Sequence, residues 1–142
     1  EALILHEVGE ALAEPLLGPA WREMIMSFNS RRSIVLARSI RDNLADCLST
    51  LPELISQGQA CSLHFYFSNL DGLRRSLFPR LVTAYEQWCA SGDNDVLLAA
   101  VEAGRSHWQG AAQLLLTTWQ QDPLASQALI DSWVEQHGPL AL

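Results

Sequence analysis

Histidines are the side chains best suited to metal or acid–base chemistry, and the chain has four of them: His6, His64, His107 and His137. None lies four residues from another, and neither the HExxH nor the Cys-x-x-Cys spacing occurs, so the sequence has no local metal-binding motif. His64 and His107 are either ligands completed by distant residues or hydrogen-bonded core histidines. We expect no bound metal and no cofactor.

Other catalytic motifs are also missing. There is no Gly-x-Ser-x-Gly turn for a serine nucleophile, and the glycines are scattered singly rather than gathered into a phosphate-binding loop. Carboxylates within a helical turn of each other, such as Glu7 with Glu10 and Glu10 with Glu14, are typical of a solvated face. The sequence therefore predicts that the protein is not an enzyme.

Three arginines, Arg31, Arg38 and Arg41, fall on one flank of a helix expected over residues 31–49. Guanidinium groups pair bidentately with carboxylates and phosphates, so this flank is one candidate anion site. The alternative is a solvated face whose charge is offset by Asp42 and Asp46. The sequence leaves both interpretations open.

Aromatic side chains concentrate in the second half of the chain, at Phe65, Tyr66, Phe67, Phe78, Tyr85, Trp88, Trp108 and Trp119. They either line an apolar ligand cavity, with polar groups supplied by Tyr66, Tyr85 and His107, or form an ordinary aromatic core.

The longest regular element must be the helix at Asp93–Trp119, with Asp93 or Asn94 as its N-cap. Apolar or small residues recur at spacings of three and four, at Leu97, Val101, Gly104, Trp108, Ala111 or Ala112, Leu115 and Trp119. A neighbouring stripe of Val96, Ala100, Ala103, His107, Ala111 and Leu114 is small apart from its imidazole. That flank walls a pocket or packs closely against another helix.

The other elements also read as helices. We expect a first helix at residues 2–13 ended by Pro15, a helix at 31–49, and a short one opened by Pro52. Residues 60–69 alternate like a strand, but no partner strand exists elsewhere, so helix is expected there too. The sequence thus predicts an all-α fold, a single bundle of about six or seven helices.

Composition limits the partners and the location. The net charge of −7 argues against nucleic acid as a direct partner, because phosphate neutralisation needs a basic surface. No apolar run reaches the about 18 residues of a membrane span, so no membrane contact is expected. Three cysteines, Cys47, Cys61 and Cys89, have no metal-type spacing and indicate reduced, buried thiols in a cytoplasmic protein.

One stretch, Tyr66–Leu116, resembles the C-terminal effector (FCD, FadR-like) domains of GntR-family bacterial transcription regulators. The resemblance rests on the aromatic cluster His64–Phe67, on Trp88-Cys89-Ala90-Ser91-Gly92-Asp93, and on His107-Trp108-Gln109-Gly110 of the next helix. Upstream, Leu36-Ala37 to Asn43 is similar to a Leu-Ala…Asn segment of that family, with one residue inserted.

This resemblance implies a helical ligand-binding domain that forms a homodimer and contacts DNA only through an N-terminal winged helix missing from this chain. Many members bind metal through an aspartate and three histidines, but Val82 stands where one histidine is expected, which favours the metal-free, FadR-like variety. In that branch the effector is an acyl-CoA, and Arg38 or Arg41 are candidates for its phosphates.

The sequence therefore supports two hypotheses. The first is a regulatory domain that senses a small organic acid or acyl thioester, with ligand-binding residues His107, Gly104, Trp108, Tyr66, Tyr85, His64, Arg38 and Arg41. The alternative is a helical protein-interaction or scaffold module without a small-molecule ligand.

Overall fold

The computed structural model describes residues 1–142, and every regular element in it is helical. The elements are α1 (Ala2–Leu17), α2 (Pro19–Ser27), α3 (Arg31–Ala45), the π-helical segment η1 (Asp46–Thr50), α4 (Leu51–Gln57), α5 (Ala60–Asn69), α6 (Gly72–Leu77), α7 (Pro79–Ser91), α8 (Asn94–Gln121), α9 (Ser126–Glu135) and the 3₁₀ turn η2 (Gly138–Leu140). Because α3, η1 and α4 join end to end, the chain has eight separate helices. The predicted all-α bundle is confirmed.

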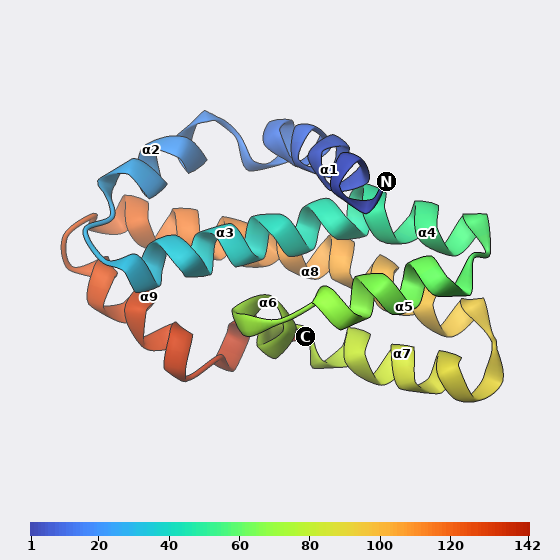
Figure 1. The fold of residues 1–142 in the computed structure, drawn as a ribbon. Helices are drawn as coiled ribbons and strands as arrows, with labels where there is room; N and C mark the ends of the chain where they lie inside the picture. Colours follow the sequence, from blue (N-terminus) through green and yellow to red (C-terminus); the bar gives the residue numbers. More distant parts are fainter.

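Two long helices carry the structure. Helix α8 and the combined helix α3–η1–α4 lie side by side along the long axis, and α1 crosses over the α3–η1 junction (Figure 1). Helix α7 packs along the first half of α8, and α9 packs against α3 and α8 at the other end. None of the helices combines the length and the apolar character that crossing a membrane requires.

Helix α8 follows its sequence pattern closely. The Asp93 side chain accepts a hydrogen bond of 2.9 Å from the Asp95 backbone N–H, which confirms it as the N-cap. The residues that α8 buries are Leu97, Ala100, Val101, Gly104, Trp108, Ala111, Ala112, Leu115 and Leu116. Apart from Gly104, they belong to one hydrophobic core shared by all the long helices. Trp119, at the end of the predicted stripe, is only partly buried.

The space beside Gly104, in the middle of α8, is filled by side chains. A Cβ atom built on Gly104 lies 2.6 Å from Cys47 Sγ and 2.7 Å from Phe78 Cζ. His107 donates from Nε2 to the Leu140 carbonyl at 2.8 Å, so the C-terminal turn covers this histidine. The structure therefore has close packing at Gly104, whereas Val96 and Ala100 of the same helix line an open cleft of about 470 Å³ between α7 and α8.

Two proline expectations are wrong. Pro15 does not end the first helix, because α1 continues to Leu17 and the bond from Gly18 N to Glu14 O keeps its last turn intact. Pro52 does not start a separate helix either. The wide π turn before it, closed by the bond from Leu51 N to Asp46 O, accommodates a residue that has no N–H to donate.

Residues 60–69 are helical, which confirms the expectation for this segment. Gly58, at a φ of 65°, ends α4 in the left-handed conformation. Pro79 marks a join, since α6 ends at Leu77 and α7 begins at Pro79. All three cysteines are free thiols, but the expectation that they are buried holds only for Cys47, since Cys61 and Cys89 are exposed.

The packing at Gly104 predicts opposite effects for two glycine substitutions in the same helix. Gly104→Ala forces a methyl group into the contact with Cys47 and Phe78, and we expect a loss of about 1–3 kcal/mol in the free energy of unfolding. Gly110→Ala meets no atom within 4 Å and removes a flexible residue from a helix interior, so it should add up to about 1 kcal/mol. Urea denaturation measures both. Equal stabilisation by the two variants means that the space at Gly104 is empty.

Candidate functional site

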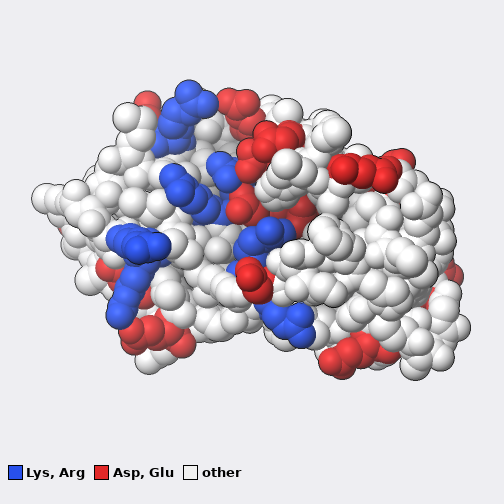
Figure 2. All heavy atoms as spheres, viewed as in Figure 1, with Lys and Arg blue, Asp and Glu red and all other residues white.

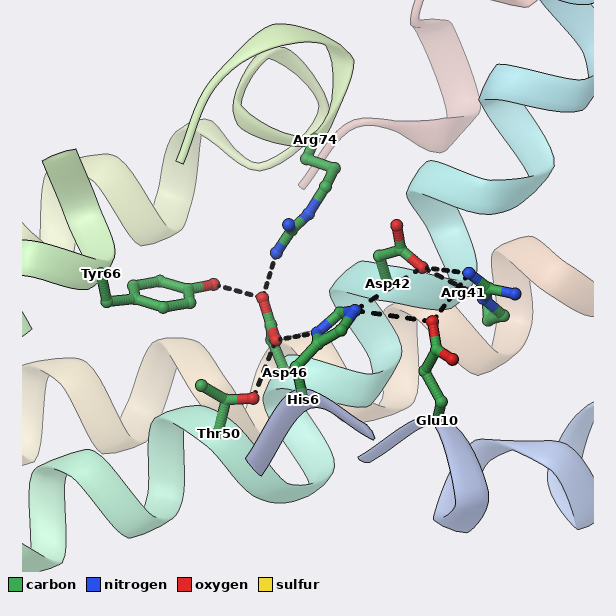
Figure 3. A network of polar contacts seen from close by, with 8 residues as sticks. All are labelled: His6, Glu10, Arg41, Asp42, Asp46, Thr50, Tyr66 and Arg74. Atoms are coloured by element: carbon green, nitrogen blue, oxygen red, sulfur yellow. Dashed lines mark hydrogen bonds and ion pairs between the residues drawn. The ribbon is translucent and has the colours of Figure 1, made fainter. Parts of the chain in front are cut away.

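The most elaborate polar arrangement centres on Asp46, the first residue of η1, whose side chain is only 2% exposed. Its Oδ1 accepts hydrogen bonds from His6 Nδ1 at 2.7 Å and from the Thr50 hydroxyl at 2.9 Å. Its Oδ2 accepts from the Tyr66 hydroxyl at 2.7 Å and from the Arg74 guanidinium (Figure 3). We call Asp46 and these four partners the Asp46 centre.

Each partner comes from a different part of the chain. His6 lies on α1, Thr50 on η1, Tyr66 on α5 and Arg74 on α6, so one carboxylate ties four segments together. The π turn itself places the Thr50 hydroxyl over Asp46, four residues earlier. Such turns are rare in helices and are found frequently at functional sites.

Electrostatics keep the centre charged. Burial raises the pKa of Asp46, but the hydrogen bond from His6 and the positive charge of Arg74 outweigh it, so the pKa lies below its ordinary value. The hydrogen bond to Asp46 raises the pKa of His6, against a smaller opposing effect of burial. Burial first, and then the charge of Asp46, hold the pKa of Tyr66 well above its usual range. Asp46 is therefore an anion at neutral pH, and Tyr66 is a neutral donor.

A second polar layer lies on the outer side of His6. Its Nε2 faces Glu10 Oε1 at 3.5 Å and Asp42 Oδ1 at 4.0 Å. Arg41 NH2 donates to the same two oxygens, at 2.8 Å each (Figure 3). These side chains are 20–31% exposed, so this layer reaches solvent while Asp46 does not. The two layers share His6.

A glycine makes this arrangement possible. Gly9 is buried where α1 crosses α3, and a Cβ built on it lies only 2.3 Å from the Ala45 carbonyl oxygen. The two backbones therefore approach more closely than any side chain allows, which brings His6 and Glu10 of α1 onto Asp42 and Asp46 of the facing helix. In the space-filling view, acidic and basic side chains meet where α1 crosses α3 (Figure 2).

An open cleft of about 240 Å³ adjoins the Asp46 centre. Its polar lining consists of His6, Asp46, Thr50, Tyr66, Asn69 and Arg74, and its apolar rim includes Leu3 and Phe65. The Nε of Arg74 is buried and has no hydrogen-bond partner within the protein. Chemically, the centre offers donors around a carboxylate that is already satisfied, which suits binding or structural linkage better than proton transfer.

The eight predicted ligand-binding residues do not meet in one pocket. Tyr66 belongs to the Asp46 centre, and Arg41 belongs to the layer outside it. His64 and Tyr85 form a separate pair, with Nδ1 and the hydroxyl 2.7 Å apart and with Tyr85 stacked on Phe67.

The remaining four lie elsewhere. Trp108 is fully buried and packs edge-on against Phe78, while Gly104 and His107 are in the α8 contacts described above. Arg38 is exposed on α3. The structure thus distributes these residues over the Asp46 centre, the α5–α7 contact, the core and the surface.

Sequence reasoning missed the residues that matter most here, namely His6, Asp46, Arg74, Glu10 and Asp42. A signal was present, since His6 with Glu10 and Asp42 with Asp46 are both four residues apart and so share helix faces. The sequence interpretation treats Glu10 as a surface charge and Asp46 as a carboxylate that offsets the arginine charges. It does not consider that the helix faces bearing these two residues can pack against each other. Periodicity within one helix contains no information on which other helix lies opposite.

Comparison with known proteins places residues 1–137 in a family described as the C-terminal domain of a family of unknown function, DUF6866. The chain belongs to this family. No curated protein and no solved structure matches the chain. The comparisons show no link to the GntR regulators. Membership of the DUF6866 family identifies the type of domain but not an activity.

The charge pairing in the Asp46 centre predicts a stability maximum between about pH 4 and pH 6.5. The folded pKa of Asp46 lies below its unfolded value of 3.8, so its contribution is present above that pH and is lost as the pH falls through the folded pKa. The folded pKa of His6 lies above 6.5, so its contribution is present below that pH and is lost as the pH rises through the folded pKa. Urea denaturation in chelator-containing buffer from pH 3 to pH 9 measures this.

Asp46→Asn tests the cause of the maximum. Removing the carboxylate leaves the half-buried Arg74 without its counter-ion and the other donors without their acceptor, and should cost about 3 kcal/mol near pH 5.5. It should also flatten the pH dependence at both ends. Glu86→Gln, an exposed carboxylate on α7, serves as the matched control and should change the unfolding free energy by less than about 0.5 kcal/mol. A variant Asp46→Asn that keeps the full pH profile contradicts the assignment.

Proposed function

We propose that this domain is a helical interaction module that packs the outward face of α1 against the polypeptide region that precedes it in its family. The observation that carries this proposal is an apolar stripe left uncovered along the whole of α1. Its members are Ile4, Val8, Leu12 and Leu16, whose exposed fractions are 69%, 47%, 50% and 45%. We call these four residues the α1 stripe.

The spacing of the stripe indicates a contact face. Its members are four residues apart, so they lie in one row on a helix that buries Gly9, Ala13 and Leu17 on its other side. Leu3, which is 71% exposed, extends the apolar surface to Phe65 of α5, which is 65% exposed at the rim of the same cleft. Single exposed apolar residues are common, whereas a continuous row of them marks an interaction site.

The preceding region of the polypeptide is the partner that fits best. The family is described as a C-terminal domain, which implies further chain on the N-terminal side in its members. Helix α1 is the first helix of this domain and therefore lies next to the join with that region. A contact between adjoining segments has a low entropic cost, because the connection already holds the two surfaces close together.

Charge substitution in the α1 stripe tests the module. In the full-length polypeptide, Val8→Glu with Leu12→Glu should release the domain, raising hydrogen exchange in α1 and opening the join to limited proteolysis. The same pair should leave the fold of the isolated domain unchanged, because both side chains already face solvent. Leu124→Glu, at a residue that is 86% exposed and lies outside the stripe, is the matched control. Equal exchange of α1 in the isolated domain and in the full-length chain contradicts the proposal, as does a homodimer that the α1 substitutions dissociate.

A second candidate is the effector-binding domain predicted from the sequence, and the cleft beside Arg74 is the observation that favours it. Its volume of about 240 Å³ lies below the about 300–1,000 Å³ of pockets for drug-sized ligands. The cleft therefore suits a small organic acid and not an acyl-CoA. Arg74 lines this cleft, and a guanidinium group pairs well with a carboxylate. Transcription regulation through such a ligand rests on the resemblance of Tyr66–Leu116 alone.

Thermal shift measurements test this second candidate. Mono- and dicarboxylates of two to six carbons at millimolar concentration should raise the melting temperature, while acyl-CoAs should not. Asn69→Leu, which narrows the cleft at an exposed position, should abolish the shift. Absence of a shift with every acid excludes effector binding at this cleft.

A further inference from the structure

We infer that His6, Glu10 and Asp42 form a binding site for a divalent transition-metal ion, Zn²⁺ in the first place, that links α1 to α3. The ligand atoms are His6 Nε2 and one carboxylate oxygen from each acid, and all three lie within 4.8 Å of one another. This inference departs from the expectation of no metal, which rested on the lack of a local motif. Two of the proposed ligands, His6 and Glu10, lie on α1, and the third, Asp42, lies on α3.

The geometry is close to that of a bound ion. Ligands about 2.1 Å from a tetrahedral Zn²⁺ are separated from each other by about 3.4 Å. The separation of His6 Nε2 and Glu10 Oε1 is 3.5 Å, and that of His6 Nε2 and Asp42 Oδ1 is 4.0 Å. Small rotations of the two carboxylates therefore complete a three-ligand site without movement of either helix. The partial exposure of all three side chains leaves room for water as a further ligand.

The inner half of the site is already arranged as metal-binding histidines require. Such histidines donate their second ring N–H to a carboxylate, which fixes the tautomer and turns the other nitrogen toward the ion. His6 Nδ1 donates to Asp46 at 2.7 Å, and Asp46 is itself held by three further donors. The lone pair of Nε2 in this tautomer faces two carboxylate oxygens, an arrangement that a cation between them stabilises (Figure 3).

Arg41 is the competing cation at this position. Its NH2 group contacts both acidic ligand oxygens, so its charge offsets part of what attracts the ion. When His6 is neutral, the carboxylates of Glu10, Asp42 and Asp46 carry three negative charges. Arg41 and Arg74 carry two positive charges, so the net charge of the two layers is −1. This balance predicts micromolar rather than nanomolar affinity, and it predicts that removal of Arg41 strengthens metal binding.

The donor set decides the type of metal. One imidazole nitrogen with two carboxylate oxygens suits Zn²⁺, and an imidazole is an unusual ligand for Mg²⁺ or Ca²⁺, which take oxygen ligands. Mn²⁺ binds the same donors more weakly than Zn²⁺ in the general affinity order of first-row metals. The expected order of affinity is therefore Zn²⁺ above Mn²⁺, with no binding of Mg²⁺.

Isothermal titration with Zn²⁺, with the exposed thiols of Cys61 and Cys89 alkylated, tests the site. We expect one equivalent to bind, and saturation at a hundredfold excess over the dissociation constant to raise the melting temperature by about 5–10 °C. Glu10→Gln and Asp42→Asn should each weaken binding at least tenfold, and Arg41→Gln should tighten it at least threefold. Glu7→Gln, an exposed acid three residues from Glu10 that lies outside the cluster, is the matched control and should change nothing.

Three outcomes overturn the inference. One is a dissociation constant for Zn²⁺ weaker than about 100 μM, which corresponds to a binding free energy less favourable than about −5.5 kcal/mol. Another is an equal loss of affinity in Glu7→Gln and Glu10→Gln, which indicates general attraction to an acidic surface. The third is stabilisation by Mg²⁺ equal to that by Zn²⁺. Circular dichroism of each variant verifies that the helices are intact.

Discussion

The buried carboxylate of Asp46 is the constraint on which the arrangement of the N-terminal half depends. A charge at 2% exposure is unfavourable unless donors and counter-charges surround it, and α1, η1, α5 and α6 each supply one. Because all four segments must be in place for the carboxylate to be satisfied, the centre specifies how they assemble as well as stabilising them. An apolar core alone does not specify how these segments are arranged, because apolar contacts are non-directional.

The inward and outward faces of α1 have different structural roles. The inward face contributes Gly9, Ala13 and Leu17 to close packing and His6 to the Asp46 centre. The outward face presents the α1 stripe, whose four apolar side chains are 45–69% exposed. One helix therefore joins a charged interior to an apolar exterior surface. Any ligand that holds α1 more firmly on α3 also fixes the orientation of that outer surface, and thermodynamic linkage makes this coupling reciprocal.

Patterns confined to one helix predicted much of the fold. The cap at Asp93, the buried row of α8 and the helical state of residues 60–69 follow from spacing and local chemistry, and all are as expected apart from the partial burial of Trp119. The extension of α1 past Pro15 and the π turn before Pro52 were not predicted, because a proline signal is overridden when only one bond of a helix is lost.

The candidate site was not predictable in the same way. Tyr66 and Arg41 were singled out as ligand residues, yet Tyr66 bonds to Asp46, 20 residues earlier in the chain, and Arg41 pairs with Glu10, 31 residues earlier. Each of these partners gains its role only through the crossing of α1 over the α3–η1 junction. The sequence shows which faces are amphipathic, but which faces meet depends on the tertiary fold.

Gly9 has a consequence for how α1 moves. At its crossing point the backbone of α1 touches that of α3 through a position with room for a hydrogen atom only. Sliding or rotating α1 along α3 brings the larger neighbours Val8 or Glu10 against the Ala45 carbonyl, so intermediate placements are sterically excluded. The helix is either seated in this single register or detached as a unit. Movement of α1 relative to α3 is therefore all-or-none and not gradual.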